Sequence, residues 1–113
     1  MFTTVVQFRL PSPITMEEAS QRFQSSAPKY VKLNGLLRKH YIVSEDGRVA
    51  GGVYHWTSRA AAEEVYSGEW RERVEKLYGA KPEILWFESP VSVDNATGTV
   101  IVEPLADAEK ASA

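Results

Sequence analysis

The chain has 113 residues, of which 43% are hydrophobic and 25% charged, and its formal net charge is −2. This length accommodates one domain with a single hydrophobic core. A slightly acidic chain without a basic stripe lacks the electrostatic footprint of nucleic-acid binding. The absence of cysteine excludes disulfides, thiolate metal sites and thiol nucleophiles.

The N-terminus has neither a basic segment nor a cleavable apolar segment, and no apolar run approaches the ~20 residues that span a bilayer. We therefore expect no membrane association and no nucleic-acid partner. The expected location is the cytoplasm.

Residues 2–10 alternate between apolar and polar side chains, which predicts a strand. Pro11 and Pro13 end it, because proline cannot donate to a strand ladder. Thr15 followed three residues later by Glu18 forms a capping box that opens a helix. The expected apolar stripe of this helix consists of Met16, Ala19, Phe23 and Ala27.

A hairpin is predicted within residues 35–56, where two runs rich in β-branched and aromatic residues flank Asp46 and Gly47. Asp-Gly favours a type I′ turn, in which both central residues have φ > 0. A two-residue turn places Lys39 opposite Tyr54, and it likewise pairs Arg38 with His55, His40 with Val53 and Tyr41 with Gly52.

Opposed residues of a hairpin share one face of the sheet. One face of the predicted hairpin therefore carries Leu36, Arg38, His40, Ile42, Val49, Gly51, Val53 and His55. The other face carries Leu37, Lys39, Tyr41, Val43, Ala50, Gly52, Tyr54 and Trp56.

After the hairpin the hydrophobic period changes from two to about 3.6, which predicts an interrupted helix. Ser58 caps an alanine-rich segment over residues 59–66. A second segment over residues 69–77 ends at Gly79, which fits a left-handed residue after a helix.

A last strand over residues 81–90 is apolar on both faces. Residues 91–95 leave the core, and residues 99–102 are expected to form a short extra strand. We expect the final Ala-Asp-Glu-Lys tail to be frayed. The last strand carries Ile84 and Trp86 on one face and Leu85 and Phe87 on the other.

The element order β-α-β-β-α-β predicts a ferredoxin-like α+β fold with a four-stranded antiparallel sheet and helices on one face. A sheet covered on one side normally alternates apolar and polar residues. Because the last strand is apolar on both faces, we expect the second face to pack against another copy in a two-fold homodimer. The domain is expected to cover residues 1–95, followed by an extension over residues 96–113.

Three segments resemble the YdhR-like monooxygenase family. They are Gly-Leu-Leu-Arg-Lys with Ser-Glu-Asp-Gly and Ala-Gly-Gly-Val-Tyr in residues 35–54, Glu-Trp-Arg at 69–71, and the Ser-Pro-Val and Val-Asp-Asn pattern of residues 87–95. The resemblance implies a dimeric α/β barrel related to the antibiotic-biosynthesis monooxygenases. That superfamily includes cofactor-free oxygenases of polyphenols, polyketide cyclases and haem-degrading enzymes.

The family pattern implies functional positions at Lys39, Gly52 and Tyr54, with an aromatic residue at Tyr41. These four residues share one face of the predicted hairpin. The sequence departs from the pattern at two positions, where His40 and His55 stand in place of an aromatic and an aliphatic residue.

The first candidate site comprises Lys39, Tyr41, Tyr54 and Trp56, with Gly52 leaving room opposite Tyr41. Two phenols and an ammonium in an apolar cavity can orient a planar aromatic or enolic substrate and stabilise its anion. The competing interpretation is that the aromatic residues are core or interface packing and the lysine stem lies along apolar surface.

The second candidate site comprises Arg38, His40 and His55 on the opposite face. Histidine is the natural general base at neutral pH, and an arginine beside it can bind an enolate or a carboxylate. The competing interpretation is a polar patch in the dimer contact. No spacing of ligands predicts a metal site.

We interpret the chain as a monooxygenase that needs no metal, flavin or haem and acts on an aromatic or polyketide-like small molecule. The expected catalytic residues are His40, His55 and Tyr54, and the expected substrate-binding residues are Lys39, Tyr41, Gly52, Trp56 and Arg38. Two alternatives stay open: a non-catalytic dimeric ligand-binding or stress-associated protein, and a polyketide cyclase or isomerase.

Overall fold

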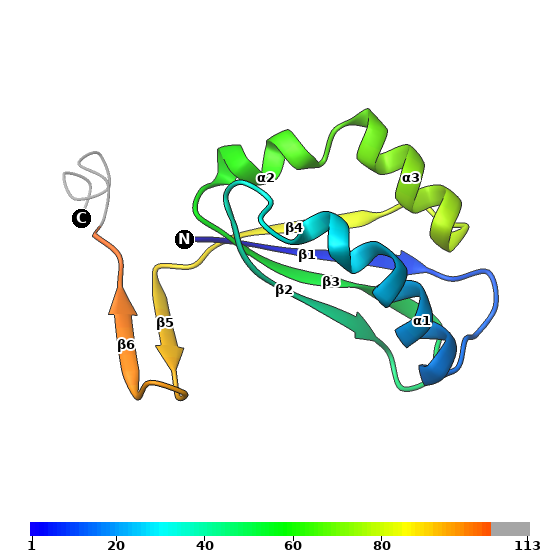
Figure 1. The fold of residues 1–113 in the computed structure, drawn as a ribbon, viewed down its shortest axis with the longest axis horizontal. Helices are drawn as coiled ribbons and strands as arrows, with labels where there is room; N and C mark the ends of the chain where they lie inside the picture. Colours follow the sequence, from blue (N-terminus) through cyan, green and yellow to red (C-terminus); the bar gives the residue numbers. More distant parts are fainter. Residues whose placement is uncertain (105–113) are drawn as a thin grey trace.

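A four-stranded sheet with helices on one of its faces forms the body of the molecule (Figure 1). The computed structural model describes residues 1–104. The elements in chain order are β1 (Phe2–Arg9), α1 (Met16–Ser26), the 3-10 helix η1 (Ala27–Tyr30), β2 (Leu36–Val43), β3 (Val49–Trp56), α2 (Arg59–Val65), α3 (Gly68–Tyr78), β4 (Glu83–Glu88), β5 (Val91–Asp94) and β6 (Thr99–Val102).

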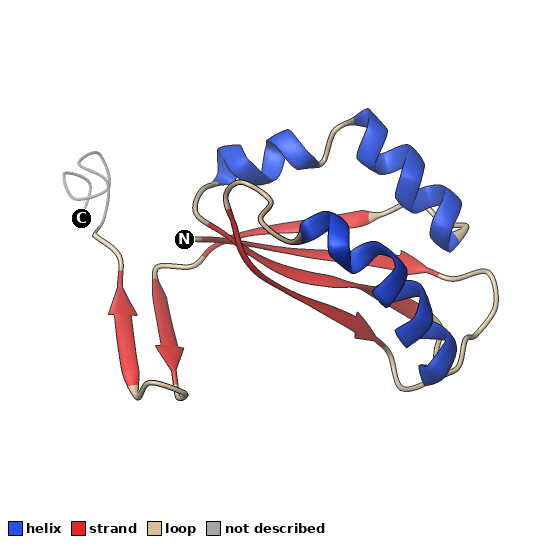
Figure 2. Ribbon diagram, viewed as in Figure 1, coloured by secondary structure: helices blue, strands red, loops and turns tan. Residues whose placement is uncertain are grey.

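The sheet has the strand order β2-β3-β1-β4, and every neighbouring pair is antiparallel. All three α-helices lie on the same face of this sheet, and the other face is bare (Figure 2). This arrangement confirms the predicted ferredoxin-like α+β fold. No helix in the described part of the chain is long and apolar enough to cross a membrane.

The predicted register of the β2–β3 hairpin is confirmed from residue 38 onward, with Lys39 opposite Tyr54. The register shifts between residues 36 and 38, so that Leu36 pairs with Trp56. Leu36 therefore packs against the core and Leu37 is exposed, the reverse of the predicted faces. An irregularity of one residue reverses every side chain beyond it.

The predicted type I′ turn is wrong. Ser44 and Val49 close a four-residue loop, with the amide of Ser44 donating to the carbonyl of Val49 at 2.8 Å. Within residues 44–49, all of which the structure describes, only Gly47 has a positive φ, 72°. Asp46 instead uses its side chain, since its Oδ1 accepts hydrogen bonds from the Ser44 hydroxyl and the Arg48 amide. Such an Asx arrangement supplies the turn without a left-handed aspartate.

The predicted helix boundaries are set by local caps. The hydroxyl of Thr15 accepts from the amide of Glu18, and the hydroxyl of Ser58 accepts from the amide of Ala61. Gly79 ends α3 with a φ of 68°, in the left-handed region where glycine is favoured. These contacts confirm three of the predicted helix signals. Met16 is exposed, so it does not belong to the apolar stripe expected for the first helix.

The core between sheet and helices is aromatic, and the fully buried side chain of Thr4 adds a hydroxyl to it. The indole nitrogen of Trp56 donates to Thr4 Oγ1 at 2.9 Å, and the same oxygen is hydrogen-bonded to the phenol of Tyr66 at 2.6 Å. Burying a polar group costs little when it is hydrogen-bonded in this way. Other buried members of this core are Phe2, Val6, Phe8, Ala50, Tyr54, Ala62, Trp70, Val74 and Tyr78.

The bare face of the sheet keeps large apolar side chains at its surface. Leu85 and Phe87 of β4 are 48% and 49% exposed, whereas Ile84 and Trp86 pack against the core, as predicted. Strands β5 and β6 pair only with each other and project from the body (Figure 1). The expected domain end at residue 95 falls in the turn of this hairpin. The expected frayed tail lies outside the described residues.

Candidate functional site

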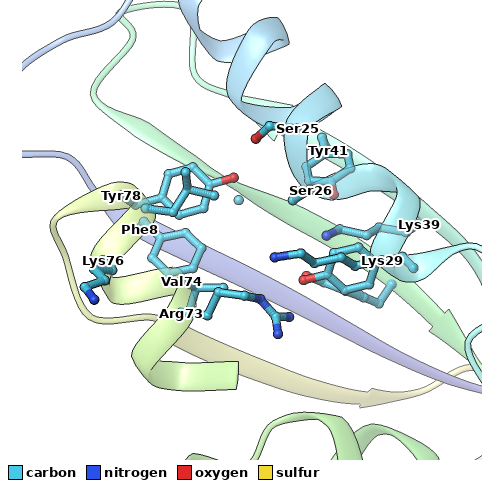
Figure 3. Close-up of a pocket in the computed structure, with 14 residues that line it drawn as sticks. Phe8, Ser25, Ser26, Lys29, Lys39, Tyr41, Arg73, Val74, Lys76 and Tyr78 are labelled. Atoms are coloured by element: carbon cyan, nitrogen blue, oxygen red, sulfur yellow. Dashed lines mark hydrogen bonds between the residues drawn. The ribbon is translucent and has the colours of Figure 1, made fainter. Parts of the chain in front are cut away.

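A cavity of about 330 Å³ lies between the sheet and the helices. Side chains from β1, β2, β3, α1, η1 and α3 line it (Figure 3). Its size is typical of a pocket for a small organic ligand. The side chains that line it include Phe8, Lys29, Tyr30, Lys39, Tyr41, Tyr54, Arg73, Val74, Lys76, Leu77 and Tyr78.

Lys39 lies at the centre of three tyrosine rings. Its Nζ is 3.4 Å from the ring centroid of Tyr30, 3.8 Å from that of Tyr41 and 4.5 Å from that of Tyr54. The absence of a side chain at Gly52 leaves room for the Lys39 stem. A Cβ at residue 52 would lie 3.1 Å from the Cε of Lys39 and 3.1 Å from a ring carbon of Tyr54. The predicted space beside Tyr41 is therefore occupied by the lysine stem.

The amine of Lys39 is largely removed from water and has no ion-pair partner among residues 1–104. Burial, and secondarily the positive charge of Arg73, lower the pKa of Lys39 to about 6. The ring faces attract an ammonium but do not replace its lost hydration. At neutral pH the predominant species is therefore a neutral amine, which can accept a proton.

Tyr41 and Tyr54 remain protonated at neutral pH. Burial, followed by the neighbouring Tyr30, raises the pKa of Tyr54 well above its usual value. Burial also raises the pKa of Tyr41, although a 2.7 Å hydrogen bond between its hydroxyl and that of Ser26 opposes the shift. Both phenols can therefore donate a hydrogen bond to an anionic oxygen while Lys39 accepts a proton.

The structure does not bring the two histidines together with Tyr54. His40, His55 and Arg38 lie near one another on the bare face of the sheet, with the sheet between them and the cavity. Nδ1 of His55 is 3.2 Å from the hydroxyl of Thr3. Burial, and then the nearby His40 and Arg38, lower the pKa of His55. The two predicted sites are therefore separate, and only the first faces the cavity.

Trp56 does not line the cavity, although it was expected to stack on a substrate. Its side chain is fully buried, and its ring lies parallel to that of Tyr54 with centroids 5.6 Å apart. Its indole nitrogen is already committed to Thr4. Trp56 therefore supports Tyr54 from within the core.

Several residues of the site were missed in the sequence, among them Tyr30 and Arg73. Tyr30 lies in η1, a single short turn that has no periodicity by which a buried face could be recognised. Arg73 follows Trp70 by three residues in α3, so helical spacing placed it near the apolar face of this helix.

Among residues 1–104, no group of three or more histidine, aspartate or glutamate side chains could hold a metal ion. The chemistry that the cavity itself offers is thus a neutral amine, phenolic donors and an aromatic wall.

No family model and no curated protein matches this chain. Solved structures do resemble it. A monooxygenase from the gene ActVA-Orf6 of Streptomyces coelicolor, in complex with nanaomycin D, has a TM-score of 0.61 at 22% identity, over 78% of this chain and 86% of its own. SnoaB, a cofactor-independent oxygenase from Streptomyces nogalater, has a TM-score of 0.60 at 16% identity, over 81% and 95%.

An antibiotic biosynthesis monooxygenase has a TM-score of 0.61 at 13% identity, over 79% of this chain and 98% of its own. At these identities the likeness establishes the fold. The chain therefore has the ferredoxin-like fold that these monooxygenases share, and its activity has to be argued from its own cavity.

Proposed function

We propose that this chain is a cofactor-independent monooxygenase of aromatic, polyketide-like small molecules. The observation that carries the proposal is the position of the Lys39 amine, which faces a cavity of about 330 Å³ among three tyrosine rings. The fold that the chain shares with ActVA-Orf6 and SnoaB supports it.

The reaction begins when the neutral amine of Lys39 takes a proton from an acidic C–H or phenol of the substrate. The phenols of Tyr41 and Tyr54 donate hydrogen bonds to the oxygen on which negative charge develops. The resulting carbanion passes one electron to dioxygen, and the radical pair combines to form a C–O bond. The ammonium of Lys39 returns its proton to the resulting peroxide anion, and loss of water from the hydroperoxide leaves a carbonyl. One oxygen atom thus enters the product and the other leaves as water.

The proposed assembly is a homodimer of the YdhR-like type in the cytoplasm, with the bare faces of two sheets in contact. The half-exposed Leu85 and Phe87 support this contact, since contiguous apolar surface of this kind marks interaction sites. In this arrangement Arg38, His40 and His55 belong to the interface.

The test is oxygen consumption with anthrones and dihydroxynaphthoquinones. The variants are Lys39→Met and Tyr54→Phe, with His55→Ala as the matched control on the other face of the sheet. We expect Lys39→Met to reduce the rate by about 100-fold or more, the usual contribution of a general base, and His55→Ala to retain it.

Other outcomes would replace the proposal. Binding of these compounds without oxygen uptake would favour the ligand-binding alternative. A cyclised or isomerised product formed under nitrogen would favour the cyclase alternative. Equal rates in wild type and Lys39→Met would remove the amine from the mechanism.

A further inference from the structure

Three cationic side chains line the cavity beside the neutral amine of Lys39, and no carboxylate of residues 1–104 does. The cations come from two elements, Lys29 from η1 and Arg73 and Lys76 from α3. Figure 3 shows Lys29, Lys39 and Arg73 on one side of the cavity, and Lys76 on the opposite side. The chain as a whole is slightly acidic, so this concentration of positive charge does not follow from its composition.

None of these three cations forms an ion pair among residues 1–104. The ion pairs there join Arg9 to Glu83, Arg59 to Glu63 and the N-terminus to Glu103. The acidic residues Glu69, Glu72 and Glu75 of α3 line a separate surface hollow that Arg73 and Lys76 also border, and none of the three reaches the cavity. A cavity of one charge sign concentrates ligands of the opposite sign.

Another part of the cavity wall is apolar. The rings of Phe8 and Tyr78 stack with centroids 4.4 Å apart, and Val74 and Leu77 complete this wall. The cavity therefore has an apolar aromatic part and a cationic end. A ligand that matches both parts has a planar ring system and an acidic substituent.

We propose that the ligand of this cavity is an aromatic carboxylate, and that Arg73 and Lys29 bind its carboxylate. The inference rests on the proposed function only in taking this cavity as the substrate site. The guanidinium of Arg73 can hold a carboxylate through two parallel hydrogen bonds, and Lys29 adds a second positive charge. The ring of the ligand then extends along the Phe8 wall, where the Lys39 amine faces it.

The test compares two probes that differ only in charge, 1-hydroxy-2-naphthoate and 1-hydroxy-2-naphthamide. Isothermal titration calorimetry measures their affinities for the full chain and for Arg73→Gln, Lys29→Gln and Lys81→Gln. Lys81 is the matched control, because it is an exposed lysine outside the cavity lining. We expect wild type to bind the acid about tenfold more tightly than the amide, a difference of about 1.4 kcal/mol.

Arg73→Gln is expected to weaken binding of the acid by about fivefold or more, as for a partly buried charge pair, and Lys29→Gln by less, because Lys29 is exposed. Both variants are expected to leave the affinity for the amide unchanged. Lys81→Gln is expected to change neither. Equal affinity for both probes, equal weakening of both by Arg73→Gln, or an effect of Lys81→Gln as large as that of Arg73→Gln would overturn the proposal. Failure of both probes to bind at millimolar concentration would overturn the ligand class.

The outcomes separate this inference from the oxygenase proposal. A preference for the acid without oxygen uptake would leave the carboxylate site standing and remove the oxygenase. Oxygen uptake that is equally fast with charged and neutral aromatic compounds would support the oxygenase and remove the carboxylate site.

Discussion

Lys39 is a destabilising residue at neutral pH, because folding forces its amine to give up a proton. The pKa of Lys39 is about 6 in the folded chain and close to 10.5 in the unfolded chain. Between these values the unfolded state binds more protons, so the contribution of this residue to stability rises with pH across that window. Methionine has nearly the same shape and does not titrate. We predict that Lys39→Met stabilises the fold by more than about 1 kcal/mol at pH 7 and by much less near pH 10.

Urea unfolding of wild type and Lys39→Met at pH 7 and pH 9.5 measures this difference. Lys81→Met is the control, since the same change at an exposed lysine should give no gap that depends on pH. The same stability difference at both pH values would show that Lys39 is charged in the folded protein.

The same titration predicts the pH dependence of turnover. A lysine that acts as a base must be neutral, so we expect kcat/KM to rise with pH through a pKa of about 6 and then to level off. Histidine titrates in the same range, which makes His55→Ala the necessary control. The rising limb should persist in His55→Ala, and residual activity of Lys39→Met should lack it. If the rise of kcat/KM with pH disappears in His55→Ala, the general base is His55 on the bare face of the sheet and not Lys39.

Gly52 determines whether the lysine fits. Alanine at this position would crowd both the stem of Lys39 and the ring of Tyr54, each 3.1 Å from the added carbon. Because the lysine stem is the more flexible of the two, we predict that Gly52→Ala displaces the amine from the tyrosine rings. The expected result is about a tenfold loss of activity with a loss of stability of only about 1–2 kcal/mol.

Thermal unfolding and oxygen consumption, measured on the same preparation of Gly52→Ala, separate the two effects. Gly68→Ala is the control, since a Cβ there meets nothing within 4 Å and alanine is the better helix former. Full activity in Gly52→Ala would show that the position of Lys39 does not matter.

Half of this site could be predicted from residue spacing. The period of two placed Lys39, Tyr41 and Tyr54 on one face, because strand alternation needs only the hairpin register. Tyr30 and Arg73 reach the same cavity from elements distant in sequence, and no local pattern reports such contacts. The sequence of the hairpin also does not determine which face of the sheet the helices cover. The helices cover the face of Lys39 and Tyr54, so the histidines lie on the other side of the sheet from the cavity.

At the scale of elements, the strands and helices were predictable because caps and alternation act over a few residues. The loop after β2 was not, since the side chain of Asp46 offers an alternative to the type I′ turn. The irregularity at Leu37 could not be predicted either. The apolar pair Leu36 and Leu37 fits either face until the register is known.

Gly35 joins β2 to α2 through a contact that only glycine permits. Its φ is 84°, its carbonyl accepts a hydrogen bond from the amide of Thr57, and an added Cβ would collide with the Cβ of Ala61. We predict that Gly35→Ala destabilises the fold by about 2 kcal/mol or more, because a left-handed alanine and an overpacked contact both carry a cost.

Gly98→Ala isolates the conformational part of this cost. Gly98 has a φ of 68° in the turn between β5 and β6, and a Cβ there meets nothing within 4 Å. Chemical denaturation should therefore show a loss of about 1 kcal/mol or less for Gly98→Ala. Equal losses of unfolding free energy in the two variants would mean that α2 shifts away from Gly35 at no cost.

At the scale of the whole molecule, residues 1–104 expose two apolar surfaces that no other part of these residues covers. One is the β4 strip of Leu85 and Phe87 on the bare face of the sheet. The other is one face of the β5–β6 hairpin, where cross-strand pairing brings four exposed valines together. Those residues are Val91, Val93, Val100 and Val102. Surfaces of this kind are costly in water and are normally covered in an assembly.

We predict that the wild-type chain is a dimer and that Phe87→Glu dissociates it, because a carboxylate from each copy would then be buried in an apolar contact. Sedimentation equilibrium at ~20 μM protein measures the mass, in the range where a sheet-to-sheet contact of standard size is stable. Val31→Glu is the control: Val31 is 69% exposed and follows η1 on the helical side of the molecule. That variant should remain a dimer. A wild-type monomer, or dissociation of Val31→Glu to the same extent, would show that the bare face of the sheet is not the contact. His40 and His55 would then face solvent and not a second subunit.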